Sequence, residues 1–146
     1  MASLSTLQDL FNQNTLDTGL WSQYTDGSAT MSYSATGAAV TFPATSSSST
    51  DGDITSVSSY NMTGSGAYMG IVSVLSGSQN DCNLTIRQNA NNYYQFQIED
   101  GTIYAQYVVA GAQTNAWSTT FSLVTHKYIR IRESGGTSFW DTSTDG

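Results

Sequence analysis

The chain has 146 residues, of which only 10% are charged, and its net charge is −7. This acidic balance argues against nucleic acid and anionic membranes as partners, because both require a basic face. Cys82 is the only cysteine, so no intrachain disulfide can form, and no apolar run approaches the about 20 residues of a membrane span.

The N-terminal residues lack the basic and apolar segments of a secretory signal. We therefore expect synthesis in a cytoplasm and release by another route, such as cell lysis. Residues 1–24 carry the only helical pattern, and polar residues soon interrupt it. We expect an arm over residues 1–24 that packs on a β body over residues 25–146, in a single domain overall. The apolar residues expected to anchor the arm are Phe11, Leu16 and Trp21.

From Ala29 onward the pattern is that of short strands separated by turn residues. The expected strands are 30–33, 38–42, 67–75, 82–87, 93–99, 102–109, 117–123, 128–132 and 137–142. The stretch 67–75 is mostly apolar, which predicts a central strand buried on both faces. Residues 44–53, rich in Ser and Thr, predict a solvated loop after Pro43.

Two hairpins stand out in this pattern. Asp100-Gly101 supplies the positive-φ turn of a two-residue hairpin between 93–99 and 102–109. Gly135-Gly136 marks the turn of the last hairpin, in which Ile129, Ile131 and Trp140 are the expected inward residues. Many short strands without a long helix favour an all-β fold, an antiparallel β-sandwich or jelly roll.

Two motifs at the ends of this pattern resemble one family. Residues 7–21 (LQDLFNQNTLDTGLW) and residues 126–146 (HKYIRIRESGGTSFWDTSTDG) are similar to the opening and to a late hairpin of concanavalin A-like lectin/glucanase jelly rolls. The version found in bacteriophage tail and virion proteins and in bacterial surface proteins is the most similar. Leu10 departs from the pattern, in which Asp or Asn is common. The fold hosts hydrolases, lectins and inert structural modules, so the resemblance implies a fold more than a function.

In similar sequences, the Asp145-Gly146 turn is followed by further strands. We therefore expect a sandwich that lacks its last strands, with 137–142 as a sheet edge. Either the chain is a piece of a longer protein, or a neighbouring subunit covers that edge, since an uncovered edge invites pairing with another chain.

Glycoside hydrolysis needs two carboxylates, about 5–5.5 Å apart for retention or about 6.5–9.5 Å for inversion. The Glu-x-Asp-x-x-Glu motif of hydrolases in this superfamily is absent. Glu99 and Asp100 belong to a turn, and Glu133 is the expected partner of Arg130 or Arg132. The sequence therefore predicts a protein that is not an enzyme.

Other chemistry has little support in the sequence. His126 is the only candidate base, it opens a strand as a hydrogen-bonding edge residue, and no nucleophile elbow accompanies it. Cys82 is expected to be a buried core residue. No cofactor and no metal are expected, although calcium stays open as an alternative. Its candidate ligands are Asp51 and Asp53, with Asp81 or Asp141 and Asp145.

Carbohydrate binding fits the aromatic and amide residues of the hairpin over 93–109. Strand alternation places the candidate ligand-binding residues on one polar face. These residues are Tyr93, Gln95, Gln97, Tyr104 and Gln106. The simpler interpretation is ordinary cross-strand pairing on a solvated face.

Together these observations predict a non-catalytic bacteriophage virion structural protein, a tail, fibre or head-decoration subunit with a lectin-like sandwich. Its expected location is the virion, and its expected partners are other virion proteins or copies of itself. Cell-surface polysaccharide is a further expected partner, and nucleic acid and membrane insertion are not. The alternative is a glycoside hydrolase or a secreted carbohydrate-binding module of the same superfamily.

Overall fold

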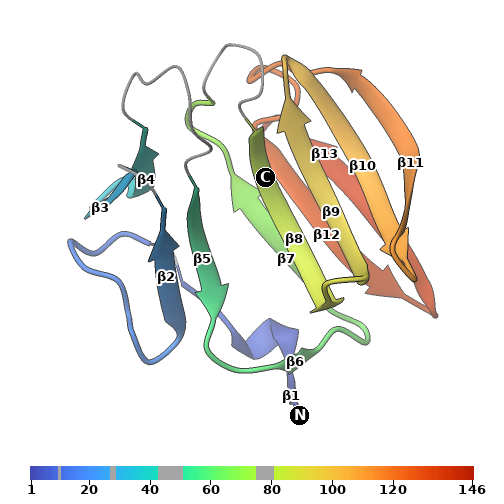
Figure 1. Ribbon diagram of the computed structural model, residues 1–146, viewed down its shortest axis with the longest axis horizontal. Coiled ribbons are helices and arrows are strands. Elements are labelled where there is room, and N and C mark those ends of the chain that lie inside the picture. Colours follow the sequence, from blue (N-terminus) through green and yellow to red (C-terminus); the bar gives the residue numbers. More distant parts are fainter. Residues whose placement is uncertain (10, 27–28, 43–50, 75–80) are drawn as a thin grey trace. The chain divides into compact units, whose positions relative to one another are not determined.

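A computed structural model describes residues 1–9, 11–26, 29–42, 51–74 and 81–146 (Figure 1). The fold is nearly all β and its sheets are antiparallel, apart from one two-residue parallel pair. This confirms the predicted all-β class. Within the described residues the only helical element is the 3₁₀-helix η1 (Leu4–Thr6). The chain forms two compact units, Met1–Asn61 and Met62–Gly146.

The first unit consists of three strand pairs. They are β1 (Ala2–Ser3) with β6 (Tyr60–Asn61), β2 (Trp21–Thr25) with β5 (Gly52–Ser56), and β3 (Thr30–Ser34) with β4 (Gly37–Thr41). The hairpin β3–β4 matches two of the expected strands. Strand β5 begins inside the stretch expected to be a loop, because its pairing with β2 overrides its polar composition. Pro43 and the rest of that expected loop, up to residue 50, lie outside the described residues.

Two of the three expected anchors of the N-terminal arm, Phe11 and Trp21, contact each other within the first unit. The rings of Phe11 and Trp21 lie 5.2 Å apart, and the indole N–H of Trp21 donates to Asp9 over 3.0 Å. Leu16 is half-buried. That these residues anchor an arm on a sandwich stays a prediction.

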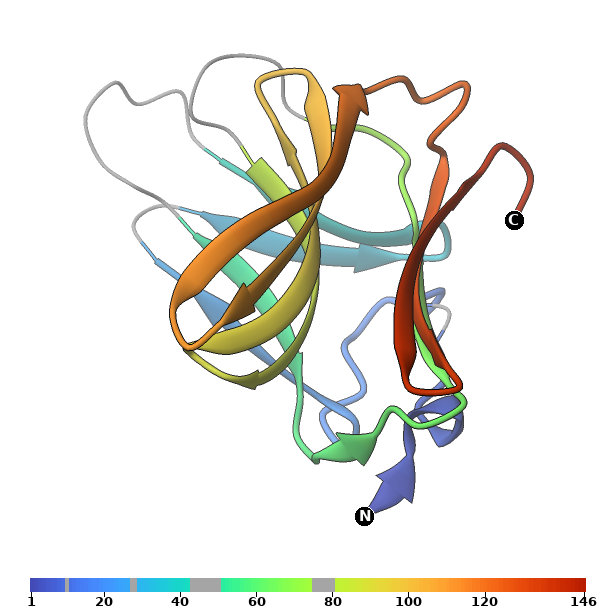
Figure 2. The ribbon, with the colours of Figure 1, turned by 90° about the vertical axis from the view of Figure 1, so that its right-hand side faces the viewer.

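The second unit contains two antiparallel sheets (Figure 2). The four-stranded sheet has the order β11 (Ala112–Thr120), β10 (Thr102–Val109), β9 (Asn92–Glu99), β8 (Asp81–Asn89). The three-stranded sheet has the order β13 (Thr137–Ser143), β12 (Tyr128–Ser134), β7 (Gly66–Gly70).

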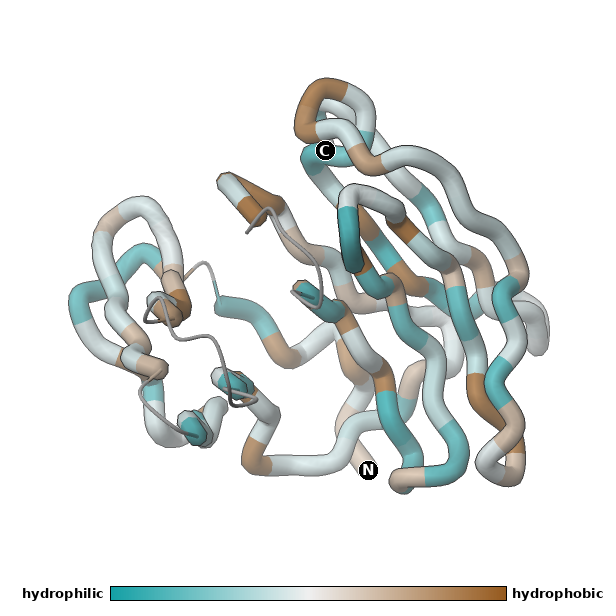
Figure 3. Tube along the Cα trace, turned by 45° about the horizontal axis from the view of Figure 1, so that its top comes forward, coloured by the Kyte–Doolittle hydropathy of each residue, from teal (hydrophilic) through white to brown (hydrophobic). Residues whose placement is uncertain are grey.

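One hydrophobic core joins these two sheets. Phe96, Ile98 and Ile103 contribute from the four-stranded sheet, and Ile129 and Ile131 from β12, all of them buried. Each such side chain contributes roughly 1.5–3 kcal/mol when it leaves water. Hydrophobic and hydrophilic residues alternate along several of these strands (Figure 3), as expected for sheets that pack one face on a core. The prediction that Ile129 and Ile131 point inward is confirmed.

Two predicted strands differ clearly from the structure. Strand β7 ends at Gly70 and is not central, since among the described residues it pairs only with β12. The apolar run did not predict burial on both faces correctly, because Tyr68, near its start, is 69% exposed. Leu75, the end of that predicted strand, lies outside the described residues. Strand β11 begins at Ala112, before the predicted 117, because Ala110-Gly111 forms a second positive-φ turn.

The predicted hairpin turns are present. Asp100 and Gly101 have φ values of 48° and 74°, as a turn of this kind requires. Gly135 and Gly136 also have positive φ and join β12 to β13. In the described part of the chain β13 pairs only with β12, so residues 137–142 form a sheet edge, as predicted.

Candidate functional site

The five predicted ligand-binding residues lie together on the outer face of the four-stranded sheet. Gln95 pairs with Gln106 across β9 and β10, and Gln97 pairs with Tyr104. Their sequence neighbours, such as Phe96 and Ala105, point into the core. Because successive strand residues alternate between faces, the five must point away from the core. We call Tyr93, Gln95, Gln97, Tyr104 and Gln106 the tyrosine face.

The two tyrosines stand at opposite ends of this face. Tyr104 lies opposite Gln97, four residues along β9 from Tyr93, which corresponds to about 13 Å along the strand. Both tyrosines are half-exposed. The Gln95–Gln106 pair lies between them, so two aromatic rings flank an amide centre.

One of the five residues is a supporting residue and not an exposed one. Gln106 is only 2% exposed, and its carbonyl oxygen accepts a 2.6 Å hydrogen bond from the amide of Gln95. The Gln97 amide donates to Asp81 over 3.2 Å. These bonds fix the orientation of both exposed amides, which reduces the conformational entropy lost when a ligand binds.

Strand β8 adds polar residues to this face that the sequence analysis did not include. Asn83, Thr85 and Arg87 lie opposite Gln97, Gln95 and Tyr93, respectively. The alternation within β8 is visible in the sequence, but the pairing of β8 with β9 is not. A sheet neighbour had to be known before these side chains could be assigned to the same face.

A second polar face covers the outside of the three-stranded sheet. Arg130 lies between Tyr68 on β7 and Asp141 on β13, and Arg132 lies between Gly66 and Phe139. Because these rows share one face, we call Tyr68, Arg130, Arg132, Phe139 and Asp141 the arginine face.

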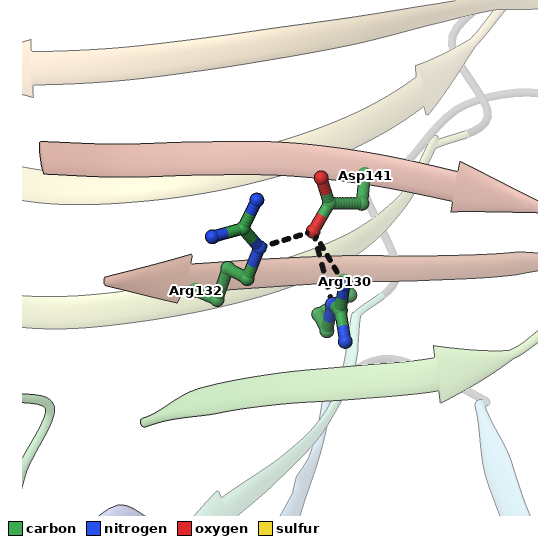
Figure 4. Close-up of polar contacts among 3 residues, drawn as sticks. All are labelled: Arg130, Arg132 and Asp141. Atoms are coloured by element: carbon green, nitrogen blue, oxygen red, sulfur yellow. Dashed lines mark hydrogen bonds and ion pairs between the residues drawn. The ribbon is translucent and has the colours of Figure 1, made fainter. Parts of the chain in front are cut away.

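One carboxylate oxygen organises the arginine face (Figure 4). Oδ2 of Asp141 accepts from Nε of Arg132 at 2.7 Å and from Nε of Arg130 at 3.0 Å. Nη2 of Arg130 lies 2.9 Å from the same oxygen. Partial burial alone would raise the pKa of Asp141. The hydrogen bonds and charges of Arg132 and Arg130 outweigh that effect, so the pKa is lowered.

Glu133 has a different partner from the one expected. Its carboxylate accepts hydrogen bonds from the backbone N–H groups of Gly64 and Gly136. These two bonds hold its pKa below the ordinary value. The ion pairs that the described residues form with Arg130 and Arg132 go to Asp141. Asp141 lies directly opposite Arg130 across the β12–β13 ladder and contacts Arg132 on the diagonal, so it takes the role predicted for Glu133. Glu133 instead ties the β12–β13 turn to the segment before β7.

No protein-family model, curated protein or solved structure matches this chain. The likeness to concanavalin A-like proteins therefore rests on the two motifs described above. The described residues include no helix that is both long and apolar enough to cross a bilayer.

His126 and Cys82 have structural surroundings. His126 is buried before β12 rather than at a polar strand edge, and its Nδ1 accepts the N–H of Ser122 over 3.0 Å. The Phe121 ring stacks on it at 5.9 Å, which explains the burial of a residue expected at the surface. Cys82 is partly buried against the core. Burial and, to a smaller extent, Asp81 raise the pKa of its thiol, which disfavours the reactive thiolate.

The calcium alternative gains no site among the described residues, which contain no group of three or more His, Cys, Asp or Glu side chains suited to a metal ion. Asp141 is held by two arginines, and the Asp145 carboxylate accepts a 2.9 Å bond from the Ser143 hydroxyl. Both carboxylates therefore already have protein partners.

Proposed function

We propose that this chain is a non-catalytic structural protein of a bacteriophage virion, with a concanavalin A-like jelly roll that binds cell-surface glycans on its tyrosine face. One observation carries the glycan part of the proposal. The β9–β10 register sets the Gln95–Gln106 and Gln97–Tyr104 pairs side by side on the face turned away from the core.

The chemistry of the tyrosine face suits a neutral sugar. Tyrosine rings offer an apolar surface to the C–H face of a pyranose ring. The amides of Gln95 and Gln97 each supply donors and an acceptor for vicinal hydroxyls. The about 13 Å between the rows of Tyr93 and Tyr104 exceeds the width of one sugar, so we expect an oligosaccharide.

A glycan array followed by calorimetry tests this proposal. Tyr93→Ala and Tyr104→Ala should each weaken glycan binding about tenfold or more, as loss of an aromatic anchor does. Tyr24→Ala is the matched control, because Tyr24 is an exposed tyrosine in the first unit. If no glycan binds at high protein concentration, or if all three variants behave alike, the glycan part is wrong.

A glycoside hydrolase is the second candidate, and one observation favours it. Asp81 and Glu99 lie directly opposite each other on the face that carries the tyrosines. Directly opposite strand residues have Cβ atoms about 4.5–5.5 Å apart, close to the carboxylate spacing of retaining enzymes. Release of reducing sugar from polysaccharide that disappears in Glu99→Gln would replace the non-catalytic proposal with this one.

The virion part of the proposal is supported by the resemblance and by two sheet edges. Within the described residues, β11 and β13 each pair on one side only. Such edges can accept a strand from another chain, here other virion proteins or copies of itself. Native mass spectrometry of the purified chain, with the genes that flank its own, tests this part. A strict monomer encoded away from virion genes would contradict it.

A further inference from the structure

The arginine face encloses an open depression with a volume of about 310 Å³, which lies at the lower end of the range for small-molecule sites. Arg130, Arg132 and Tyr68 line it, together with Glu133 and the segment Gly64–Gly66. Gly66 keeps the space beside Arg132 open, since a Cβ at that position would lie 2.7 Å from the Cβ of Arg132. The depression is therefore a consequence of this particular sequence of β7.

The two arginines are held in place and still have donors to spare. Arg132 uses Nε to bind Asp141, and its guanidinium lies over the Phe139 ring at 4.2 Å. A guanidinium has five N–H donors, so the terminal nitrogens of Arg132 are not consumed by the Nε bond. A fixed fork of this kind matches the two oxygens of a carboxylate better than a flexible lysine does.

The arginine face also gathers basic residues that are rare in this chain. Arg130 and Arg132 are two of only four basic residues in the chain, and Lys127, a third, precedes β12 with its ammonium 5.3 Å from the Tyr128 ring. Glu133 also lines the depression and is negatively charged, because hydrogen bonds from the backbone N–H groups of Gly64 and Gly136 lower its pKa. The two arginines thus balance the charges of Asp141 and Glu133, so an anion would be bound by the guanidinium N–H donors and not by a surplus of positive charge.

The exposed ring of Tyr68 indicates which chemical group carries the carboxylate of the ligand. It lies opposite Arg130 on β7 and is 69% exposed, although a large aromatic side chain gains from burial. An exposed ring beside a guanidinium pairs an apolar platform with a carboxylate-binding group. A uronic or sialic acid presents both complements, an apolar C–H face and a carboxylate, in one rigid ring.

We propose that the arginine face binds the carboxylate of an acidic saccharide, with the carboxylate on Arg130 and Arg132 and the sugar ring against Tyr68. This site lies on the three-stranded sheet, whereas the tyrosine face belongs to the four-stranded sheet, so the two proposals are independent. An acidic peptide lacks the rigid C–H face that Tyr68 would cover, so the saccharide is the better fit.

The test is a titration of the full chain with trigalacturonate, with galactotriose as the neutral probe, monitored by NMR and calorimetry. We expect trigalacturonate to shift the amide signals of β7 and β12 and to bind more weakly as salt is raised. Arg132→Gln should weaken binding by about tenfold to a hundredfold, the range for loss of a charged hydrogen bond. Tyr68→Ala provides a second variant, since its exposed side chain can be removed without loss of the fold.

Two controls separate this proposal from the previous one. Arg87→Gln removes an exposed basic residue from the other sheet and should leave trigalacturonate binding unchanged. Tyr104→Ala should also leave it unchanged, while it weakens any neutral glycan. The proposal would be overturned by galactotriose shifting the signals of β7 and β12 as strongly as trigalacturonate does. No effect of Arg132→Gln, or signal shifts confined to β9 and β10, would also overturn it. Equally tight binding of sulfate, or tighter binding of triglutamate, would overturn it in favour of a simple anion or peptide site.

Discussion

The indole N–H of Trp140 donates a 3.0 Å hydrogen bond to the main-chain oxygen of Gln95. The bond crosses from the three-stranded sheet to the strand that carries the tyrosine face. The Trp140 ring also meets Tyr94 edge-on at 5.7 Å and approaches Tyr107 at 6.4 Å. One side chain of β13 thus helps to hold the two sheets together.

Trp140→Phe should therefore destabilise the second unit. The substitution removes the indole donor and leaves the Gln95 oxygen without that partner, at a cost of about 1–3 kcal/mol in the free energy of unfolding. Urea denaturation measures the change. Trp117→Phe is the matched control, because Trp117 is an exposed tryptophan on β11 and should lose less. Equal losses in the two variants would show that the Trp140 bond has no special weight.

The lowered pKa of Glu133 predicts that the free energy of unfolding decreases at acidic pH. Its pKa is lowered in the folded chain, so the unfolded chain binds more protons as the pH falls below the ordinary value of 4.5. The stabilisation from Glu133 is present above that value and is lost as the pH falls through the lowered folded pKa. Glu133→Gln should be less stable at pH 7 and should lose less stability on acidification. Chemical denaturation of both proteins between about pH 7 and about pH 3 measures the difference in the free energy of unfolding. Parallel pH profiles would contradict the expectation.

The all-β class and the hairpins could be predicted because their signals are local. Alternation along 93–109 and the Asp100-Gly101 turn require only adjacent residues, and both are present in the structure. The partner of Arg130 and Arg132 required a cross-strand register. Glu133 is next to Arg132 in sequence, whereas Asp141 reaches both arginines only because β13 pairs with β12.

The residues of the two candidate sites also differ in whether a local signal was enough to predict them. Strand alternation was enough to group Tyr93, Gln95 and Gln97 on one face, since they belong to one strand. It could not show that Gln106 is almost completely buried, because burial depends on what surrounds a residue. The arginine face was missed for a related reason: Tyr68 belongs to a run that the sequence analysis assigned to a buried strand.

Gly66→Ala should close the depression on the arginine face. The new Cβ would lie 2.7 Å from the Cβ of Arg132 and 2.8 Å from the carbonyl oxygen of Ile131, so the strands must shift. We expect a loss of about 1–3 kcal/mol, as for other overpacked positions, together with weaker trigalacturonate binding. Gly135→Ala is the comparison, since that Cβ meets nothing and costs only the strain of φ +60°. If Gly135→Ala weakened ligand binding as much as Gly66→Ala, the effect would not be local.

Asp141→Asn separates stability from binding at the arginine face. Arg130 is 52% exposed and Asp141 33%, so solvent screens the pair and we expect a loss of only about 0.5–1 kcal/mol. The variant removes a negative charge but also the group that positions both guanidinium forks, and these changes act on binding in opposite directions. At high salt, where charge is screened, the loss of guanidinium positioning should dominate and weaken binding. At low salt, the gain in positive charge should dominate and strengthen it. Trigalacturonate affinity relative to the wild type should therefore fall as salt is added.

A double-mutant cycle of Asp141→Asn with Arg132→Gln measures directly the coupling between these two residues in trigalacturonate binding. A coupling of zero would mean that Asp141 does not position Arg132, although 2.7 Å separates Nε from Oδ2.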